Sequence, residues 1–403
     1  MEGYLSIKET AKKWGVSERR INQYCTEGRI PGAQKFGKSW AIPESAEKPD
    51  DPRKKRERPE KKVKEKSERR PWEHSNLMPL MNTAFAPGQV KEAVEAMNKG
   101  IQRDIAWSEY YYFSGHPEEA AREVEPYLTS SDRGARLSAC LIYAYSNLSL
   151  GNIQKARVAL NELNATLEAA GKQSPNFQAA SAFVALSGAV LLHLPLPEGM
   201  PKTEGFFPLL PPGLRAFALY VQAHYLYLKG EYAHSAGSVE ATLSMGAAEY
   251  PIPAIYLHLV AVMDYMSLKQ MDRAREHLLS AWELARPDDL IEGFGEHHGL
   301  LGGMLEAVIK QNWPEDFKRI IDITYRFSSG WRRVHNPITG HDVADDLSTT
   351  EFAAAMLAAR GWTNTEIGEH MNISVNTVKK HISQTMKKLH MKDRKELKNY
   401  MLR

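Results

Sequence analysis

A phrase of aromatic and aliphatic residues, then Gly, then a small residue, recurs along the middle of this 403-residue chain. Its copies are residues 110–115 with Ala120, 143–151 with Ala156, 225–230 with Ala236 and, more weakly, 265–270 with Ala274. The residue that follows the apolar part of each copy is Gly115, Gly151, Gly230 or Gln270. These positions are 36, 79 and 40 residues apart, which corresponds to one, two and one step of a single period. Gly ends helices readily, and a small residue lets the following helix pack closely. The sequence therefore predicts helical hairpins in series over residues 76–335.

This periodic pattern resembles tetratricopeptide-like repeats. The resemblance implies a central α-solenoid whose concave face binds a small molecule, a peptide or another protein. Tyrosines 110–112, Tyr225 and Tyr227 are candidates for a pocket on that face. Aromatic residues at such spacings more often form the repeat core, which is the interpretation we favour.

Residues 347–403 hold the sharpest local signals. Four side chains are predicted to cap helices, Ser348, Thr363, Ser374 and Asp393, and the first two open capping boxes with Glu351 and Glu366. The third helix, of about 15 residues, separates into two faces at helical spacing. Its apolar stripe is Val378, Ile382, Met386 and Leu389, and its opposite face is Asn376, Lys379, Lys380, Ser383 and Lys387. A basic helix placed after a tight turn indicates insertion into the major groove rather than a plain surface helix.

This run resembles the LuxR/GerE-type helix-turn-helix over about 55 residues. The resemblance implies a four-helix DNA-binding domain that works as a dimer. By position it assigns base reading to Lys379, Lys380 and Ser383, phosphate contacts to Thr365, Asn376, Thr377, His381 and Lys387, and dimer contacts to Leu397, Tyr400 and Met401. Three positions depart from the usual pattern. Thr350 replaces an Arg, Gly368 replaces an Ala and is expected to loosen the second helix slightly, and Ser383 replaces a longer side chain.

Residues 1–46 predict a second, smaller DNA-binding unit. Ser6 begins a helix to about Trp14, and Ser17 caps another from Glu18 to about Glu27. The exposed face of that second helix carries Arg19, Arg20 and Gln23. Residues 30–43 predict a small hairpin, or wing, with Lys35 and Lys38 near its tip and with Trp40 and Ile42 packing back on the helices. The pattern over residues 4–43 resembles the MerR/excisionase-like winged helix-turn-helix family, which implies DNA binding through the second helix and the wing.

A phosphate-loop expression, GxxxxGK[ST], falls inside this wing at residues 32–39. A true phosphate loop lies between a hydrophobic strand and a helix whose N-terminus holds the phosphate. Here a helix and turn precede the expression, and residues 40–43 that follow it are extended and end in Pro43. We therefore expect no nucleotide site, no other cofactor and no enzyme activity.

Charge divides the chain into basic ends and an acidic middle. Residues 1–46 carry a net charge of +3, residues 47–75 carry +4, residues 76–346 carry −9 and residues 347–403 carry +5. Basic ends favour contact with a polyanion, here double-stranded DNA. Residues 47–75 are charged, rich in Pro and without apolar periodicity, which is typical of a flexible linker. We expect a second short linker at 336–346.

The remaining features concern compartment, membrane and metal. The two cysteines, Cys25 and Cys140, are too few for a disulfide framework and indicate a reducing cytoplasm. Residues 173–197 have no charged side chain, but their apolar part is short and interrupted, so a buried helix is favoured over a membrane span. Glu292, Glu296, His297 and His298 suggest a metal, yet adjacent histidines do not share a helix face, and no metal is expected.

The fold class expected is mainly α, with an N-terminal winged helix-turn-helix, a central α-solenoid and a C-terminal four-helix helix-turn-helix. We predict that the protein is a dimeric, sequence-specific DNA-binding transcription regulator. We expect it in the bacterial cytoplasm, associated with the nucleoid. Its repeat domain would sense an unidentified ligand or protein. Two alternatives remain open, a DNA-architectural or recombination accessory protein and an interaction scaffold with DNA-binding ends.

Overall fold

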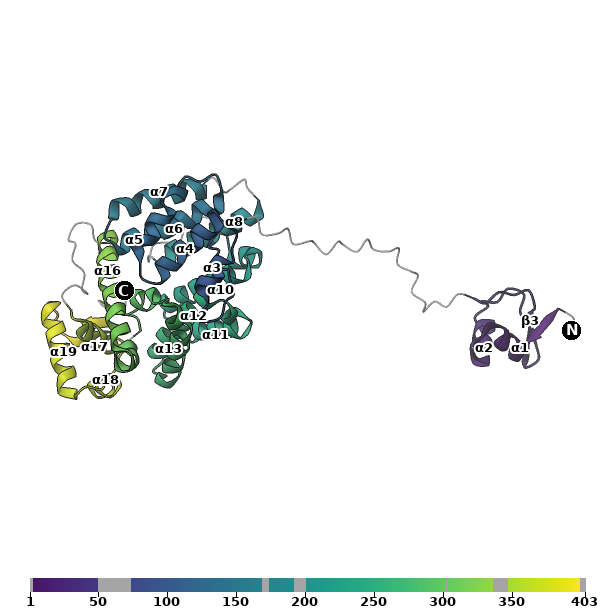
Figure 1. The fold of residues 1–403 in the computed structure, drawn as a ribbon. Helices are drawn as coiled ribbons and strands as arrows, with labels where there is room; N and C mark the ends of the chain where they lie inside the picture. Colours follow the sequence, from purple (N-terminus) through teal and green to yellow (C-terminus); the bar gives the residue numbers. More distant parts are fainter. Residues whose placement is uncertain are drawn as a thin grey trace. The chain divides into compact units, whose positions relative to one another are not determined.

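The computed structural model describes residues 3–49, 74–168, 174–191, 201–301, 303–335 and 347–398, without the side chains of residues 168, 328–335 and 349. The chain forms two compact units, Met1–Arg70 and Pro71–Arg403. Helices dominate the second unit, and the only strands of the described residues lie in the first (Figure 1). The prediction of a mainly α fold is therefore confirmed. Most of the predicted linker 47–75 and all of 336–346 lie outside the described residues.

The first unit packs two helices on a three-stranded antiparallel sheet. Its elements are β1 (Tyr4–Ser6), α1 (Ile7–Trp14), α2 (Glu18–Thr26), β2 (Gln34–Phe36) and β3 (Ser39–Pro43), with the strands in the order β1-β3-β2. Strand β1 is not anticipated by the sequence, and it pairs Leu5 with Ile42. Ile42 is 0 % exposed and lies in a core with Ile21 and Tyr24.

The hairpin predicted over residues 30–43 is confirmed as β2 and β3. Its turn holds Gly37, at a φ of 58°, and Lys38. Strand β3 follows the phosphate-loop expression where a nucleotide-binding loop would need a helix. At α1 Ser6 accepts a hydrogen bond from the backbone N–H of Glu9, as a capping box requires. Ser17 stands at the start of α2, but its side chain makes no capping hydrogen bond.

The helical body of the second unit is built from consecutive helices that pack as pairs. The pairs are α4 (Ile101–Phe113) with α5 (Pro117–Val124), α6 (Arg133–Ser149) with α7 (Ile153–Glu168), α10 (Pro212–Leu228) with α11 (Tyr232–Ser244), and α12 (Pro251–Ser267) with α13 (Met271–Ala285). The other helices are α3 (Val90–Glu95), α8 (Pro175–Leu191), α9 (Thr203–Phe206), α14 (Glu292–Glu296), α15 (Lys310–Asn312) and α16 (Pro314–His335), with a π-helix at Leu305–Ile309.

The recurring phrase coincides with the turn inside each pair. Gly115, Gly151 and Gly230 have φ angles of 82°, 73° and 79°, a left-handed backbone conformation that glycine adopts without steric cost. In the fourth copy the left-handed residue is Lys269, at a φ of 58°, one position before the predicted Gln270. The small residues that follow are all buried: Ala120, Ala156, Ala236 and Ala274. The hairpins are thus confirmed, while their relation to tetratricopeptide repeats stays a prediction.

Helix α8 accounts for the uncharged stretch of the chain. It packs against α6 and α10, and Phe177, Phe183 and Val184 on it are at most 2 % exposed. Among the described residues, no helix has the length and apolar character needed to cross a membrane.

The tyrosines considered for a pocket, residues 110–112, 225 and 227, are buried or half-buried against the core. The favoured interpretation of both features is confirmed.

Three helices follow in the C-terminal part of the same unit: α17 (Thr349–Ala359), α18 (Asn364–Met371) and α19 (Val375–Lys388). Helix α17 packs on α18 and α19 and also on the helical body. On the body side, a Cβ atom added at Gly299 would lie 2.2 Å from the Phe352 ring, so the glycine allows the ring to lie on the backbone. A Cβ atom added at Gly303 would lie 3.5 Å from the Leu357 side chain.

Candidate nucleic-acid interface

The four predicted caps of the C-terminal helices are all present. Ser348 and Thr363 form capping boxes with Glu351 and Glu366, and Ser374 accepts a hydrogen bond from the backbone N–H of Thr377. Asp393 caps a short 3-10 turn, Arg394–Glu396, which leads into the start of a fourth helix at residues 397–398. Each cap satisfies N–H groups that a helix leaves without internal partners, and so fixes where the helix begins.

The turn between α18 and α19 is tight. Asn372 ends α18 in the left-handed conformation, with a φ of 53°, and α19 begins three residues later. Gly368 is buried beside this turn, and a Cβ atom there would lie 2.9 Å from the carbonyl oxygen of Ile373. The glycine therefore accommodates a close approach of helix and turn. Helix α18 is continuous across it, and the slight loosening expected from the sequence stays a prediction.

Helix α19 separates a buried face from an exposed basic one, as predicted. Val378 is 0 % and Ile382 is 5 % exposed, while Met386 and Leu389 are partly buried against the core. The predicted base-reading side chains Lys379, Lys380 and Ser383 are exposed. Of the predicted phosphate-contacting residues, Thr365, Asn376 and Lys387 are exposed, and Thr377 and His381 are half-buried.

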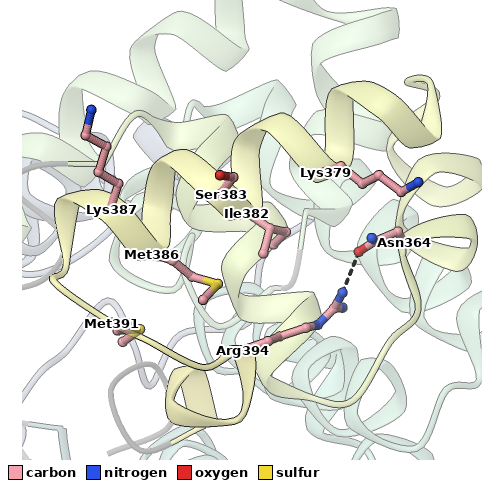
Figure 2. A pocket seen from close by; sticks show the side chains of 8 residues that line it. All are labelled: Asn364, Lys379, Ile382, Ser383, Met386, Lys387, Met391 and Arg394. Atoms are coloured by element: carbon pink, nitrogen blue, oxygen red, sulfur yellow. Dashed lines mark hydrogen bonds between the residues drawn. The ribbon is translucent and has the colours of Figure 1, made fainter.

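An open groove of about 470 Å³ runs along one side of α19. Figure 2 shows Lys379, Ser383 and Lys387 along the helix, with Ile382 and Met386 pointing toward Arg394 and Met391 below them. Arg394 donates hydrogen bonds to the Asn364 side chain and to the carbonyl oxygen of Trp362, so it ties the segment after α19 to the start of α18. Sequence reasoning missed Arg394 and Asn364, because 30 residues separate them.

The lysines of α19 differ in their partners. Lys388 donates to Glu351 at 2.7 Å and holds α19 against α17. Burial raises the pKa of the Glu351 carboxyl, but hydrogen bonds from Lys388 and Ser348 outweigh it and leave the pKa below its usual value. Within the described part of the chain, Lys379, Lys380 and Lys387 form no ion pair. Their charges are therefore available to a polyanion.

The structure describes only one of the three predicted dimer residues. Leu397 is 0 % exposed and belongs to the hydrophobic core of the second unit. Tyr400 and Met401 lie outside the described residues. The dimer contact stays a prediction.

In the first unit, α2 exposes Arg19 and Gln23, and Gln23 donates to Glu27 at 2.7 Å. Arg20 is half-buried and donates to the Tyr24 hydroxyl at 3.1 Å. Lys35 lies in β2 with its ammonium group 5.8 Å from the centre of the Trp40 ring, and Lys38 is exposed in the turn. These positions are compatible with DNA contacts, which stay a prediction.

The metal suggested by Glu292, Glu296, His297 and His298 finds no geometric support. Among the described residues, no three acidic, histidine or cysteine side chains are grouped so as to hold a metal ion. His298 instead hydrogen-bonds Glu306 at 2.9 Å, and His297 hydrogen-bonds the Tyr220 hydroxyl at 2.9 Å.

Capped helices α17 to α19, a tight turn before α19 and a basic face on α19 without ion pairs among the described residues are the arrangement of a helix-turn-helix DNA-binding domain. Residues 345–401 match the family of bacterial regulatory proteins of the luxR family, a family of DNA-binding transcription regulators. No curated protein and no solved structure matches the chain. The match covers the C-terminal resemblance seen in the sequence; the MerR-like and tetratricopeptide-like interpretations stay predictions.

Proposed function

We propose that the protein is a sequence-specific transcription regulator in which α19 lies in the major groove of DNA. Lys379, Lys380 and Ser383 would read bases, and the exposed or half-buried residues around them would hold phosphates: Thr365, Asn376, Thr377, His381 and Lys387. The observation that carries this proposal is the basic face of α19, which forms no ion pair within the described residues and lies opposite a buried or partly buried apolar stripe, in a domain that matches a family of regulators.

We also propose that the helical body controls this domain in response to a ligand or a protein partner. The contacts of the body with this domain seen among the described residues lie on α17, α18 and Arg360. Lys269 forms an ion pair with Glu366 at 3.3 Å, and the Arg360 side chain reaches Tyr227 in α10. A change in the body would therefore reach α19 through α17 and α18.

The experiment is selection of bound DNA from a random pool with the full-length protein, followed by affinity measurements on the selected site. We expect the double variant Lys379→Ala/Lys380→Ala to bind that site at least about tenfold more weakly, because two base-reading contacts are lost together. The matched control is Lys392→Ala/Lys395→Ala, which removes two exposed lysines outside α19. Equal affinity and specificity of the first double variant and the wild type would refute the proposal.

A second candidate function is that of a DNA-architectural or recombination accessory protein. It is favoured by the small unit with Arg19, Lys35 and Lys38 exposed near its second helix and hairpin. It predicts that the protein bends its DNA site and that its removal leaves transcription unchanged. Repeating the selection without residues 1–46 shows whether this unit reads sequence together with α19. The scaffold alternative predicts instead a stable protein partner and DNA binding that is weak and independent of sequence.

A further inference from the structure

The open groove beside α19 combines three cationic side chains with an apolar floor. Lys379, Lys387 and Arg394 carry the charges, and none of the residues that line the groove is acidic. The floor includes Ile382 and Met391, which are 5 % and 8 % exposed and belong to the hydrophobic core of the unit. A surface of this composition attracts an anion that also carries apolar groups.

Arg394 keeps donors beyond those that tie the local structure together. A guanidinium has five N–H groups, and two hydrogen bonds join Arg394 to the Asn364 side chain and to the carbonyl oxygen of Trp362. Both acceptors are neutral, and Arg394 forms no ion pair within the described part of the chain. Burial lowers the pKa of its guanidinium, as expected for a cation that loses water without gaining an anion.

The cations stand toward opposite ends of the groove. In Figure 2 the Arg394 side chain reaches toward Asn364 on the side of Lys379, while Lys387 lies at the other end of the stretch of α19 that is drawn. Lys379 and Lys387 are eight positions apart, which is about 12 Å along the helix axis. A single small anion does not span that length. A chain of phosphates with apolar sugar rings between them does.

We propose that this groove holds the sugar–phosphate backbone of one DNA strand, with Arg394 on one phosphate, Lys387 on another and the apolar floor against the deoxyribose rings between them. The inference rests on the proposed function and adds Arg394 to the residues that contact phosphates. A guanidinium suits this role, because its fork of N–H groups matches two phosphate oxygens. The exposed face of α19 is left free to read bases, since phosphate contacts set the position of a helix and base contacts set its specificity.

The test pairs a protein variant with a neutralised phosphate. Duplexes of the selected DNA site carry one methylphosphonate, a linkage without negative charge, at one position after another in each strand. Full-length wild type should bind about tenfold more weakly when the linkage against Arg394 is neutral, and Arg394→Gln should bind the unmodified site about tenfold more weakly. Neutralising that same linkage should then change the affinity of Arg394→Gln by no more than about twofold.

Two variants separate a phosphate contact from a structural role of Arg394. Lys392→Gln removes an exposed lysine that does not line the groove, so it should keep the tenfold effect at that linkage. Asn364→Ala removes a hydrogen-bond partner of Arg394 but keeps its charge, so it should keep the effect as well. A purely structural Arg394 would instead leave Arg394→Gln as sensitive as wild type to every neutral linkage.

Lys387 tests whether one strand fills the groove. Lys387→Ala should become insensitive to a neutral linkage in the same strand as the Arg394 linkage, but at a different position. Arg394→Gln should also reduce the slope of log affinity against log salt concentration by about one, because one phosphate contact is lost.

Full sensitivity of Arg394→Gln to every neutral linkage would overturn the phosphate contact. Linkages for Arg394 and Lys387 in opposite strands would overturn the placement of a single strand in the groove. In both cases, weaker binding by Lys379→Ala/Lys380→Ala would leave the proposed function standing. Equal binding by that double variant and wild type would refute the proposed function alone, and wild-type protein that selects no DNA would refute both.

Discussion

Arg360 joins the DNA-binding domain to the helical body, and its removal should measurably loosen that joint. It is the residue after α17, and its Nη2 donates to the Tyr227 hydroxyl at 2.7 Å and to the carbonyl oxygen of Leu300. Its Nε and Nη1 are buried without hydrogen-bond partners in the described part of the chain. The side chain thus gains two hydrogen bonds and loses the hydration of two N–H-bearing nitrogens.

The size of the effect follows from these contacts. A hydrogen bond to a charged group contributes about 1.5–3 kcal/mol to stability, and two are lost in Arg360→Met, which keeps an unbranched apolar stem. Relief of the dehydrated nitrogens offsets part of that loss, so we expect the free energy of unfolding to fall by about 2–3 kcal/mol. Tyr227→Phe, which removes one of the two acceptors of this charged group, should cost about 1.5 kcal/mol.

The assay is a double-mutant cycle by urea unfolding of the full-length protein. If the Arg360–Tyr227 hydrogen bond joins the two parts, the coupling energy should be about 1.5 kcal/mol. The comparison pair is Lys269 and Glu366, whose side chains are 45 % and 41 % exposed. Solvent screens that ion pair, so its coupling should not exceed about 1 kcal/mol. An Arg360–Tyr227 coupling below about 0.5 kcal/mol would refute the reasoning.

Three further predictions concern pH, packing and salt. Burial raises the pKa of Asp264 from 3.8 to about 8. Between these values the folded protein holds a proton that the unfolded chain releases, so the free energy of unfolding falls as the pH rises. Asp264→Asn should flatten this fall, measured by urea unfolding at about pH 5 and about pH 8. Gly299→Ala places a Cβ 2.2 Å from the Phe352 ring and should lower the free energy of unfolding by about 1–3 kcal/mol, measured in the same way. Lys387→Ala should reduce the slope of log affinity for DNA against log salt concentration by about one, because one phosphate contact is lost; an unchanged slope would contradict that contact.

Helix starts and the faces of α19 were predictable because their causes are local. Ser348 and Thr363 each find their capping partner three residues away, within the same helix. The buried stripe of α19 follows from spacing alone. Strand β1 was not predictable in this way. Its three residues become a strand only through pairing with β3, 37 positions along the chain for Leu5 and Ile42.

Sites that depend on distant contacts escaped prediction for the same reason. Glu292 and Glu296 stood out in the sequence only as possible metal ligands beside two histidines. What surrounds Glu296 is Tyr112, 184 residues earlier, and Tyr256, 40 residues earlier. Lys269 also escaped, because a left-handed residue that is not glycine or asparagine has no composition signal.

The composition of α17 explains why the DNA-binding domain is joined to the body at all. Residues 353–359 are all at most 7 % exposed, and five of the seven are alanine. A helix that is apolar on every side is buried on every side. One side of α17 packs on α18 and α19, and the other lies on Gly299 and Gly303. Because the same small helix supports α19 and lies on the body at Gly299, we expect a displacement of the Gly299 segment to reach α19 through α17.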